Sequence, residues 1–343
     1  MPNSEAYVIT APEISGTIRA TAEDFQVDED LGFEPDGAGE HVFLKIRKRN
    51  ANTDWVARQI ARVAGVRPGD VSYAGMKDRN AVTTQWFSVQ LPGRDMPDWT
   101  PLQSDNLQVL SAVRNSRKLR RGALRGNRFT LVVRGLSAAS TELEQCLRRI
   151  VAQGVPNYFG EQRFGHDAGN LDKAEAMFKG TLKVRDRHVR GLYLSAARSQ
   201  LFNRVLSRRV MDGTWNQALP GEVLMLNGSH SVFVADTVDA TLEQRLATFD
   251  IHPTGPLWGR GTSMAREQSL AVEQSALADY ATFRTGLEHA GLSQERRALR
   301  LRVADLSWEF PTAETLQLSF SLPAGAYATS VLKELIQVTG DRI

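Results

Sequence analysis

Residues 73–89 read YAGMKDRNAVTTQWFSV, which places a short turn between two runs typical of β-strands. The first run covers residues 71–74, and the second, rich in β-branched and aromatic side chains, covers residues 82–89. Gly75 allows the chain to adopt a positive φ or to pass close to other backbone. The stretch therefore predicts two strands joined by a tight loop that carries its charged residues at the tip.

Asp78 stands at the tip of this loop, between Lys77 and Arg79. A single aspartate in such a turn is most often a solvated turn residue. The flanking cations favour its ionised carboxylate, and a carboxylate that acts as a nucleophile must be ionised. The loop by itself leaves both interpretations open.

The most strongly charged segment is 114–128, with seven basic residues in fifteen positions and no acid. These basic residues are Arg114, Arg117, Lys118, Arg120, Arg121, Arg125 and Arg128. Like charges at this density repel one another unless a polyanion neutralises them. A solvated basic surface is the alternative. Because the whole chain carries a formal charge of only +3, nucleic-acid binding would have to come from local clustering of this kind.

Asn127 and Phe129 lie at the end of the basic segment and lead into the apolar run 130–133. An amide there can hydrogen-bond the edge of a pyrimidine, and an aromatic ring can stack on the base. The pair indicates recognition of an RNA base at the foot of a basic loop.

A second charged segment, residues 23–30, is acidic and surrounds Phe25 and Val27. Calcium-binding loops carry a glycine and regularly spaced oxygen ligands, and this pattern is missing here. The residues alone favour a solvated acidic rim around a strand.

Strand-like alternation dominates before about residue 153 and resumes after about residue 301. An exception in the first part is a helix expected from 52–54 to Gly65. The span between is richer in helical periods, as at 183–210 and 263–290, and residues 253–259 predict a turn-rich loop within it. A helix is also expected from Tyr327 to Ile336. We therefore expect a discontinuous domain of residues 1–152 and 302–343, interrupted by an inserted module of residues 153–301.

Composition places the chain among globular proteins: 343 residues with 42% apolar content can bury the cores of two domains. The single cysteine, Cys146, excludes an internal disulfide and fits a reducing cytosol. The N-terminus lacks the pattern of a signal peptide, and no run of about 18 apolar residues occurs. A cytoplasmic protein without membrane contact is expected.

Four motifs together resemble the TruD family of tRNA pseudouridine synthases. The loop matches its signature at Gly75, Lys77, Asp78, Ala81, Thr83 and Gln85, and the basic segment matches at Lys118, Leu119, Arg120, Gly122, Gly126, Asn127 and Phe129. Residues 25–29 match the family's first motif, and residues 156–165, PNYFGEQRFG, match the motif that opens its inserted domain.

The resemblance implies roles for individual residues. Asp78 is the expected nucleophile, and Arg19 matches a basic position that pairs with it. The expected uridine-binding residues are Phe25, Asn127, Phe129 and Tyr327, of which Tyr327 stands where the family has phenylalanine. If buried, its additional hydroxyl needs a hydrogen-bond partner. The expected RNA-binding residues are Lys77, Arg79, Arg114, Arg117, Lys118, Arg120, Arg121, Arg125 and Arg163.

The resemblance also implies the fold and the reaction. The fold is α/β (α+β): a catalytic domain with a mostly antiparallel mixed sheet flanked by helices, interrupted by a helix-rich α/β module. The reaction is isomerisation of a tRNA uridine, expected at position 13 in the D arm, to pseudouridine, with no cofactor, no metal and no obligate protein partner. The nucleophile attacks either C1′ of the ribose or C6 of the base. Two alternatives stay open: a noncatalytic, chaperone-like RNA-binding protein that uses segment 114–128, and an aspartate-based hydrolase.

Overall fold

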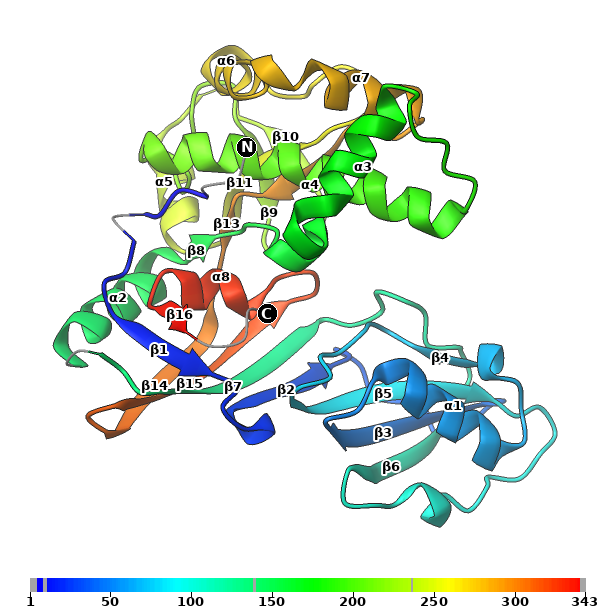
Figure 1. Cartoon of the computed structure of the whole chain (residues 1–343). Coiled ribbons are helices and arrows are strands. Elements are labelled where there is room, and N and C mark those ends of the chain that lie inside the picture. The colour runs from blue at the N-terminus through cyan, green and yellow to red at the C-terminus, as the bar shows by residue number, and fades with distance from the viewer. Residues whose placement is uncertain (1–4, 9–10, 138–139, 236, 340–343) are drawn as a thin grey trace.

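A large mixed β-sheet organises the computed structural model, which describes residues 5–8, 11–137, 140–235 and 237–339 (Figure 1). Its central strand order is β14-β15-β7-β2-β5-β3-β6, and β1, β4 and β16 join at the sides. The strands are β1 (Ser15–Ile18), β2 (Phe25–Asp30), β3 (His41–Arg49), β4 (Val71–Tyr73), β5 (Val82–Gln90), β6 (Leu107–Asn115), β7 (Gly126–Arg134), β14 (Ala304–Thr312), β15 (Thr315–Pro323) and β16 (Gln337–Thr339).

Neighbouring strands of this sheet run antiparallel, except for two parallel pairs, β2 with β5 and β1 with β16. The expectation of a mostly antiparallel mixed sheet is confirmed. Strands before residue 135 pair directly with strands after residue 303, since β15 lies against β7 over nine residue pairs. The two ends of the chain thus build one sheet.

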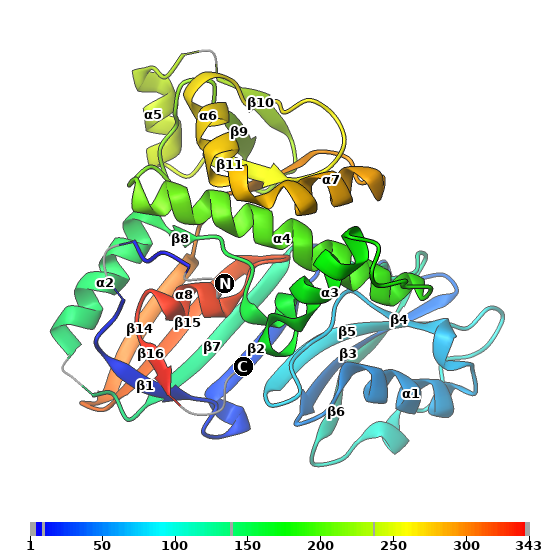
Figure 2. The ribbon, with the colours of Figure 1, turned by 45° about the horizontal axis from the view of Figure 1, so that its top comes forward.

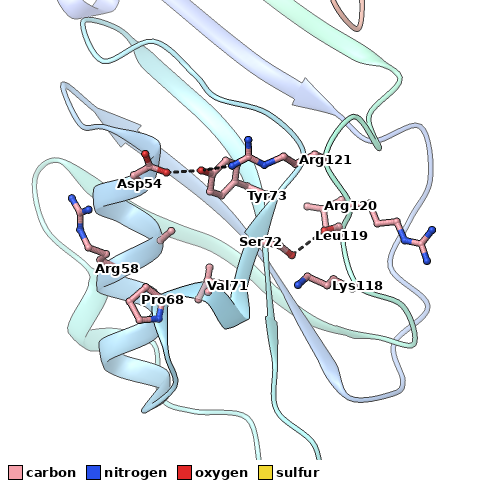
Figure 3. A pocket seen from close by; sticks show the side chains of 12 residues that line it. Asp54, Arg58, Pro68, Val71, Ser72, Tyr73, Lys118, Leu119, Arg120 and Arg121 are labelled. Atoms are coloured by element: carbon pink, nitrogen blue, oxygen red, sulfur yellow. Dashed lines mark hydrogen bonds between the residues drawn. The ribbon is translucent and has the colours of Figure 1, made fainter. Parts of the chain in front are cut away.

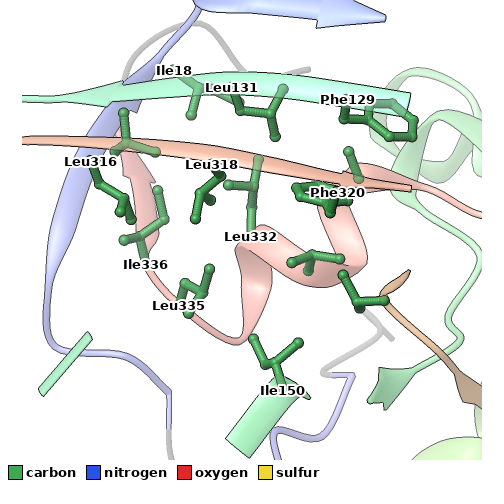
Figure 4. Packing of buried hydrophobic residues seen from close by; sticks show 14 of the residues in the cluster. Ile18, Phe129, Leu131, Ile150, Leu316, Leu318, Phe320, Leu332, Leu335 and Ile336 are labelled. Atoms are coloured by element: carbon green, nitrogen blue, oxygen red, sulfur yellow. The ribbon is translucent and has the colours of Figure 1, made fainter. Parts of the chain in front are cut away.

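Helices cover one face of the sheet at its two ends, with the middle strands β2 and β7 between them (Figure 2). Helix α1 (Thr53–Ala64) buries Val56 and Ile60 against Leu44 and Phe87. It ends at Gly65, whose φ of 61° is the left-handed conformation that glycine adopts most readily. At the other end, α2 (Ser140–Gln153) and α8 (Ala328–Lys333) pack on β7 and β15. Figure 4 shows Leu332 and Leu335 against the leucines of these strands.

The span between residues 156 and 300 forms a second layer of helices around a smaller sheet. Its helices are α3 (Gly169–Phe178), α4 (Arg187–Met211), α5 (Ala240–Ala247), α6 (Glu267–Ala276) and α7 (Ala281–His289). Its strands, in the order β10-β9-β11-β12, are Val232–Val234, Val223–Leu226, Ile251–Leu257 and Glu295–Ala298. In Figure 2, α4 lies between this sheet and the large one.

The chain enters and leaves this second layer side by side. Strand β8 (Val155–Pro156) precedes it, β13 (Arg300–Leu301) follows it, and the two pair antiparallel. The boundaries at 152/153 and 301/302 stay a prediction. Among the described residues, no helix has both the length and the apolar character needed to cross a membrane.

Two local expectations were wrong. Residues 253–257 belong to strand β11 rather than to a loop. The prolines are tolerated because each half of β11 pairs with one neighbouring strand, residues 251–253 with β9 and residues 254–257 with β12. Neither proline therefore lies between two paired strands, where its missing amide would break a hydrogen-bond ladder. The C-terminal helix spans only Ala328–Lys333, and Tyr327 is its N-cap residue. The chain turns after residue 334 because strand β16 must return to pair with β1.

Candidate active site

Asp78 lies in the loop between β4 and β5, where its carboxylate meets Arg19. Arg19 Nη2 donates to Asp78 Oδ2 at 2.8 Å, and the guanidinium carbon of Arg19 lies 4.0 Å from the centroid of the Phe25 ring. Arg19 has a φ of 58°, a left-handed conformation rare for a side chain of this size. The structure thus brings together three predicted site residues from three separate segments, with 39% of the Asp78 side chain exposed.

The loop that carries Asp78 is held by buried side chains of α1 and β5. Thr53 Oγ1 accepts a hydrogen bond from the amide of Lys77 at 3.1 Å and donates to Gln85 Oε1 at 3.0 Å. Gln85 Nε2 in turn donates to the carbonyl of Gly75 at 2.9 Å. Because Thr53 and Gln85 are fully buried, these bonds fix the backbone that precedes Asp78.

Lys48 also holds the loop, through hydrogen bonds to main-chain carbonyls. Its ammonium donates to the carbonyl of Asp78 at 2.9 Å and to that of Ala51 at 2.8 Å. Burial lowers the pKa of Lys48 to about 8, an effect that the carboxylate of Asp78 opposes and the ammonium of Lys77 adds to. Sequence analysis missed Lys48 as a site residue. The available signal was its position in β3, on the same side of the strand as Val42, Leu44 and Ile46.

Lys77 is also occupied inside the protein. Its ammonium lies 2.7 Å from Glu29 Oε1, and Glu29 Oε2 accepts from the amide of Trp86 at 2.8 Å. Glu29 is buried, as is Asp24, which pairs with Arg134. The expectation of a solvated acidic rim is therefore wrong for these two carboxylates, because each has a cation and an amide as partners.

Phe129 and Asn127 lie on the same side of the sheet as Phe25. Residues directly opposite one another in paired strands point to the same face, and the register places Thr83, Val27, Phe129 and Phe320 in one row. The Phe129 ring stacks on Phe320 at 5.4 Å and meets Phe25 edge-on at 6.4 Å. Both Phe25 and Phe129 are buried.

Asn127 lies opposite Glu29 and next to the end of β15. Its Oδ1 atom is buried and accepts no hydrogen bond from a described residue. The hydroxyl of Thr83, in the same row as Phe129, is likewise buried and without such a partner. Both residues lie on the face of the sheet that carries Phe25 and Phe129.

Tyr327 contacts a different part of the molecule. Its hydroxyl accepts a hydrogen bond from Arg163 Nη2 at 2.8 Å, and Arg163 Nη1 donates to Ser195 Oγ at 3.0 Å. This bond supplies the partner that the additional hydroxyl requires. The ring packs beside Tyr158 and Phe159, and none of its contacts with described residues reaches Asp78.

The cations of the basic segment differ in the contacts that they make within the protein. Arg114 donates to the carbonyl of Leu91 at 3.4 Å, and Arg125 Nε donates to Asp30 Oδ2 at 2.8 Å. The exposed remainder makes no ion pair within the described chain; these residues are Arg117, Lys118, Arg120, Arg121 and Arg128. Arg79, in the Asp78 loop, is also exposed.

Beside this segment lies a hollow of about 590 Å³, between α1, β4 and residues 118–121 (Figure 3).

No group of three or more His, Cys, Asp or Glu side chains among the described residues is arranged to hold a metal ion.

Comparisons with known proteins agree on one family. The family model described as tRNA pseudouridine synthase D (TruD) matches residues 2–171 and 168–335. A tRNA pseudouridine synthase D of Nitrosococcus oceani is 55% identical over 97% of this chain and 93% of its own length, and one of Methylococcus capsulatus is 53% identical over 94% and 91%. A crystal structure from Methanosarcina mazei, titled with the same family name, superposes with a TM-score of 0.77 at 22% identity, over 97% of this chain and 96% of that one.

Proposed function

This chain belongs to the tRNA pseudouridine synthase D (TruD) family, and from that premise we propose that it converts one uridine of tRNA into pseudouridine with Asp78 as nucleophile. The proposed target is uridine 13 in the D arm. The observation that carries the proposal is the Asp78 carboxylate, paired with Arg19 on a loop whose backbone is held by Thr53, Gln85 and Lys48.

The reaction breaks the N1–C1′ bond of the uridine and forms a C5–C1′ bond to the same base. Asp78 attacks either C1′ of the ribose or C6 of the base, and the temporary bond to the carboxylate holds one fragment while the uracil turns. The proton at C5 is lost and N1 ends with one, so substrate and product contain the same atoms. Because no electrons or groups are exchanged with a third molecule, we propose that no cofactor is used.

Two buried polar atoms without a partner among the described residues, Asn127 Oδ1 and the Thr83 hydroxyl, support binding of a uracil. The N3–H group of uracil can donate to Asn127 Oδ1, and one of its carbonyls can accept from the Thr83 hydroxyl. The flat guanidinium of Arg19, which already lies on Phe25, offers a surface on which a base can stack. Turning a nucleotide out of its stack costs a few kcal/mol, and these contacts would offset that cost.

The exposed cations of the basic segment and of the Asp78 loop that form no ion pair with a described residue support contacts with the tRNA backbone. We propose this role for Arg79, Arg117, Lys118, Arg120, Arg121 and Arg128. Lys77, Arg114, Arg125 and Arg163 were also expected to bind RNA, but their partners in the protein favour structural roles. We further propose that the protein acts in the cytoplasm, since the single cysteine fits a reducing compartment.

The test is the Asp78→Asn variant, which keeps the shape of the side chain and removes its charge. We expect it to bind unmodified tRNA as the wild type does and to form no pseudouridine, as mapped by carbodiimide-blocked reverse transcription. Asp95→Asn, in an exposed loop, is the matched control and retains activity. Turnover by Asp78→Asn would refute the nucleophile assignment. A wild-type protein that binds tRNA without modifying it would favour the noncatalytic RNA-binding alternative.

A further inference from the structure

The hollow beside the basic segment is a separate cavity whose walls carry mostly positive charge. Four cations line it, Arg58 of α1 and Lys118, Arg120 and Arg121, together with the carboxylate of Asp54. That carboxylate already accepts a hydrogen bond from the hydroxyl of Tyr73. At about 590 Å³ the cavity has the size of a small-molecule or nucleotide site.

The cations stand on backbone that is fixed. Leu119 is 1% exposed and packs with Ala74 and Trp86. Ser72 Oγ donates to the carbonyl of Leu119 at 2.9 Å, and the amide of Gly122 donates to the carbonyl of Ala74 at 2.7 Å. Segment 118–122 is therefore tied to β4 at both ends. An anion entering the hollow would meet side chains whose backbone is already ordered, which reduces the entropy lost on binding.

The charges of the hollow lack compensation from the protein. Arg58, Lys118, Arg120 and Arg121 are exposed, and none forms an ion pair with a described residue. The guanidinium of Arg121 lies 5.3 Å from the ring centroid of Tyr73 and donates to its hydroxyl at 3.3 Å, which holds it at the wall of the hollow. Four cations against one engaged carboxylate select an anionic ligand.

We propose that this hollow binds a phosphate, with its attached nucleotide, of the same tRNA whose uridine reaches Asp78. The inference rests on the proposed function for the identity of the RNA. Tyr73, in the wall of the hollow, precedes Asp78 by five residues, which span at most about 18 Å of extended chain. One RNA molecule can therefore occupy both places. Contacts in the hollow would position the substrate and supply affinity without taking part in the chemical step.

The experiment compares Arg58→Gln with Arg62→Gln. Arg62 lies one turn further along α1, is exposed, and lies outside the hollow, so both variants lose the same charge from the same helix. Binding of a tRNA transcript is measured at several salt concentrations in the Asp78→Asn background. We expect Arg58→Gln to weaken binding about three- to tenfold and to reduce the slope of log K against log salt by about one unit. Arg62→Gln should change both far less.

A second variant and a second readout complete the test. Arg121→Gln, checked for wild-type thermal stability, should resemble Arg58→Gln in affinity and in salt slope. With Asp78 intact, both hollow variants should need about three- to tenfold more tRNA to reach half of their maximal single-turnover rate. Equal losses from Arg58→Gln and Arg62→Gln, or no loss from either hollow variant, would overturn the proposal. So would competition by free uridine monophosphate as strong as competition by tRNA.

The two proposals fail in different ways. If the wild-type protein makes no pseudouridine, the proposed function fails, while the binding comparison between Arg58→Gln and Arg62→Gln can still be read. If pseudouridine forms normally and the hollow variants bind tRNA as well as the wild type, only the hollow proposal fails.

Discussion

Lys48 is a buried cation that hydrogen-bonds the backbone of the Asp78 loop instead of forming an ion pair. It is 1% exposed, and the acceptors of its ammonium are the main-chain carbonyls of Asp78 and Ala51. Removing an ammonium from water disfavours its charged form, which explains why the pKa falls from 10.5 to about 8. The hydrogen bond from Lys48 helps to position the backbone of Asp78, although burying the ammonium is itself unfavourable.

The lowered pKa of Lys48 predicts how stability changes with pH. Above about pH 8 the native lysine loses its proton, while the unfolded lysine keeps it up to about pH 10.5. The unfolded state then binds more protons, so this group makes the free energy of unfolding rise with pH in that window, by up to about 3 kcal/mol. Urea unfolding of the wild type and of Lys48→Met, below pH 8 and near pH 10.5, measures the difference.

Lys48→Met isolates the contribution because the other titrating groups remain. Its stability should lack the rise that the wild type shows relative to it. Parallel stability curves for the two proteins would contradict a perturbed lysine. The same variant should form pseudouridine at least about tenfold more slowly, because the carbonyl of Asp78 loses its charged donor, worth roughly 1.5–3 kcal/mol.

At the scale of elements, the Asp78 loop depends on the start of one helix and the middle of one strand. Thr53 is the first residue of α1, and Gln85 lies within β5. Together they satisfy the amide of Lys77 and the carbonyl of Gly75, which the loop itself leaves without partners. The signature spacing between Gly75 and Gln85 thus has a structural reason: the glutamine returns along β5 to hold the turn.

Replacing Thr53 by valine tests this support. Valine keeps the branched shape and removes the hydroxyl, so the amide of Lys77 and the carboxamide of Gln85 each lose a partner inside the protein. We expect unfolding to become easier by about 1–3 kcal/mol and the single-turnover rate to fall about tenfold or more, with tRNA affinity little changed. Single-turnover assays measure the change in rate, and urea unfolding measures the change in stability.

Thr53→Ser is the matched control because it retains the hydroxyl. It should keep most of the rate and most of the stability. If Thr53→Val and Thr53→Ser behave alike, the hydroxyl does not support the loop.

For the whole molecule, the chain passes only twice between the large sheet and the second layer along the described residues, but the two parts also share side-chain contacts. Strands β8 and β13 form the two crossings, and Arg163 joins Tyr327 at the start of α8. Tyr327 packs in a cluster with residues of the inserted layer, while its neighbour Ala328 belongs to the core of the large sheet. The hydroxyl of Tyr327 therefore links the two parts.

Tyr327→Phe removes this link and retains the ring. We expect a loss of about 1–2 kcal/mol in the free energy of unfolding, since the bond involves a charged donor and is only partly buried. Pseudouridine formation should fall much less than in Tyr327→Ala, which also removes the ring. Tyr280→Phe is the control, because that hydroxyl bonds no described residue. A loss of stability no larger than that of Tyr280→Phe would show that the Arg163 bond contributes nothing.

Much of the fold and part of the candidate site could be predicted from local patterns. The content of β-branched and aromatic residues predicted the strand at 82–89, and Gly65 predicted the end of α1, because residue type and positive φ are local properties. The same reasoning misplaced the prolines of β11, whose tolerance depends on which neighbour pairs with which half of the strand. It also left Asp24 and Glu29 in solvent, because their cationic partners Arg134 and Lys77 are distant in sequence.

The sequence by itself determined the family and the aspartate between Lys77 and Arg79, since both depend on residue types at short, fixed spacings, and the resemblance to the family implied the mixed sheet. The tertiary structure alone decided which cations form ion pairs inside the protein, because pairing joins residues such as Lys77 and Glu29, 48 positions apart. It also decided that Lys48 supports the loop and that a basic hollow forms beside β4, since burial and cavities depend on packing between distant segments.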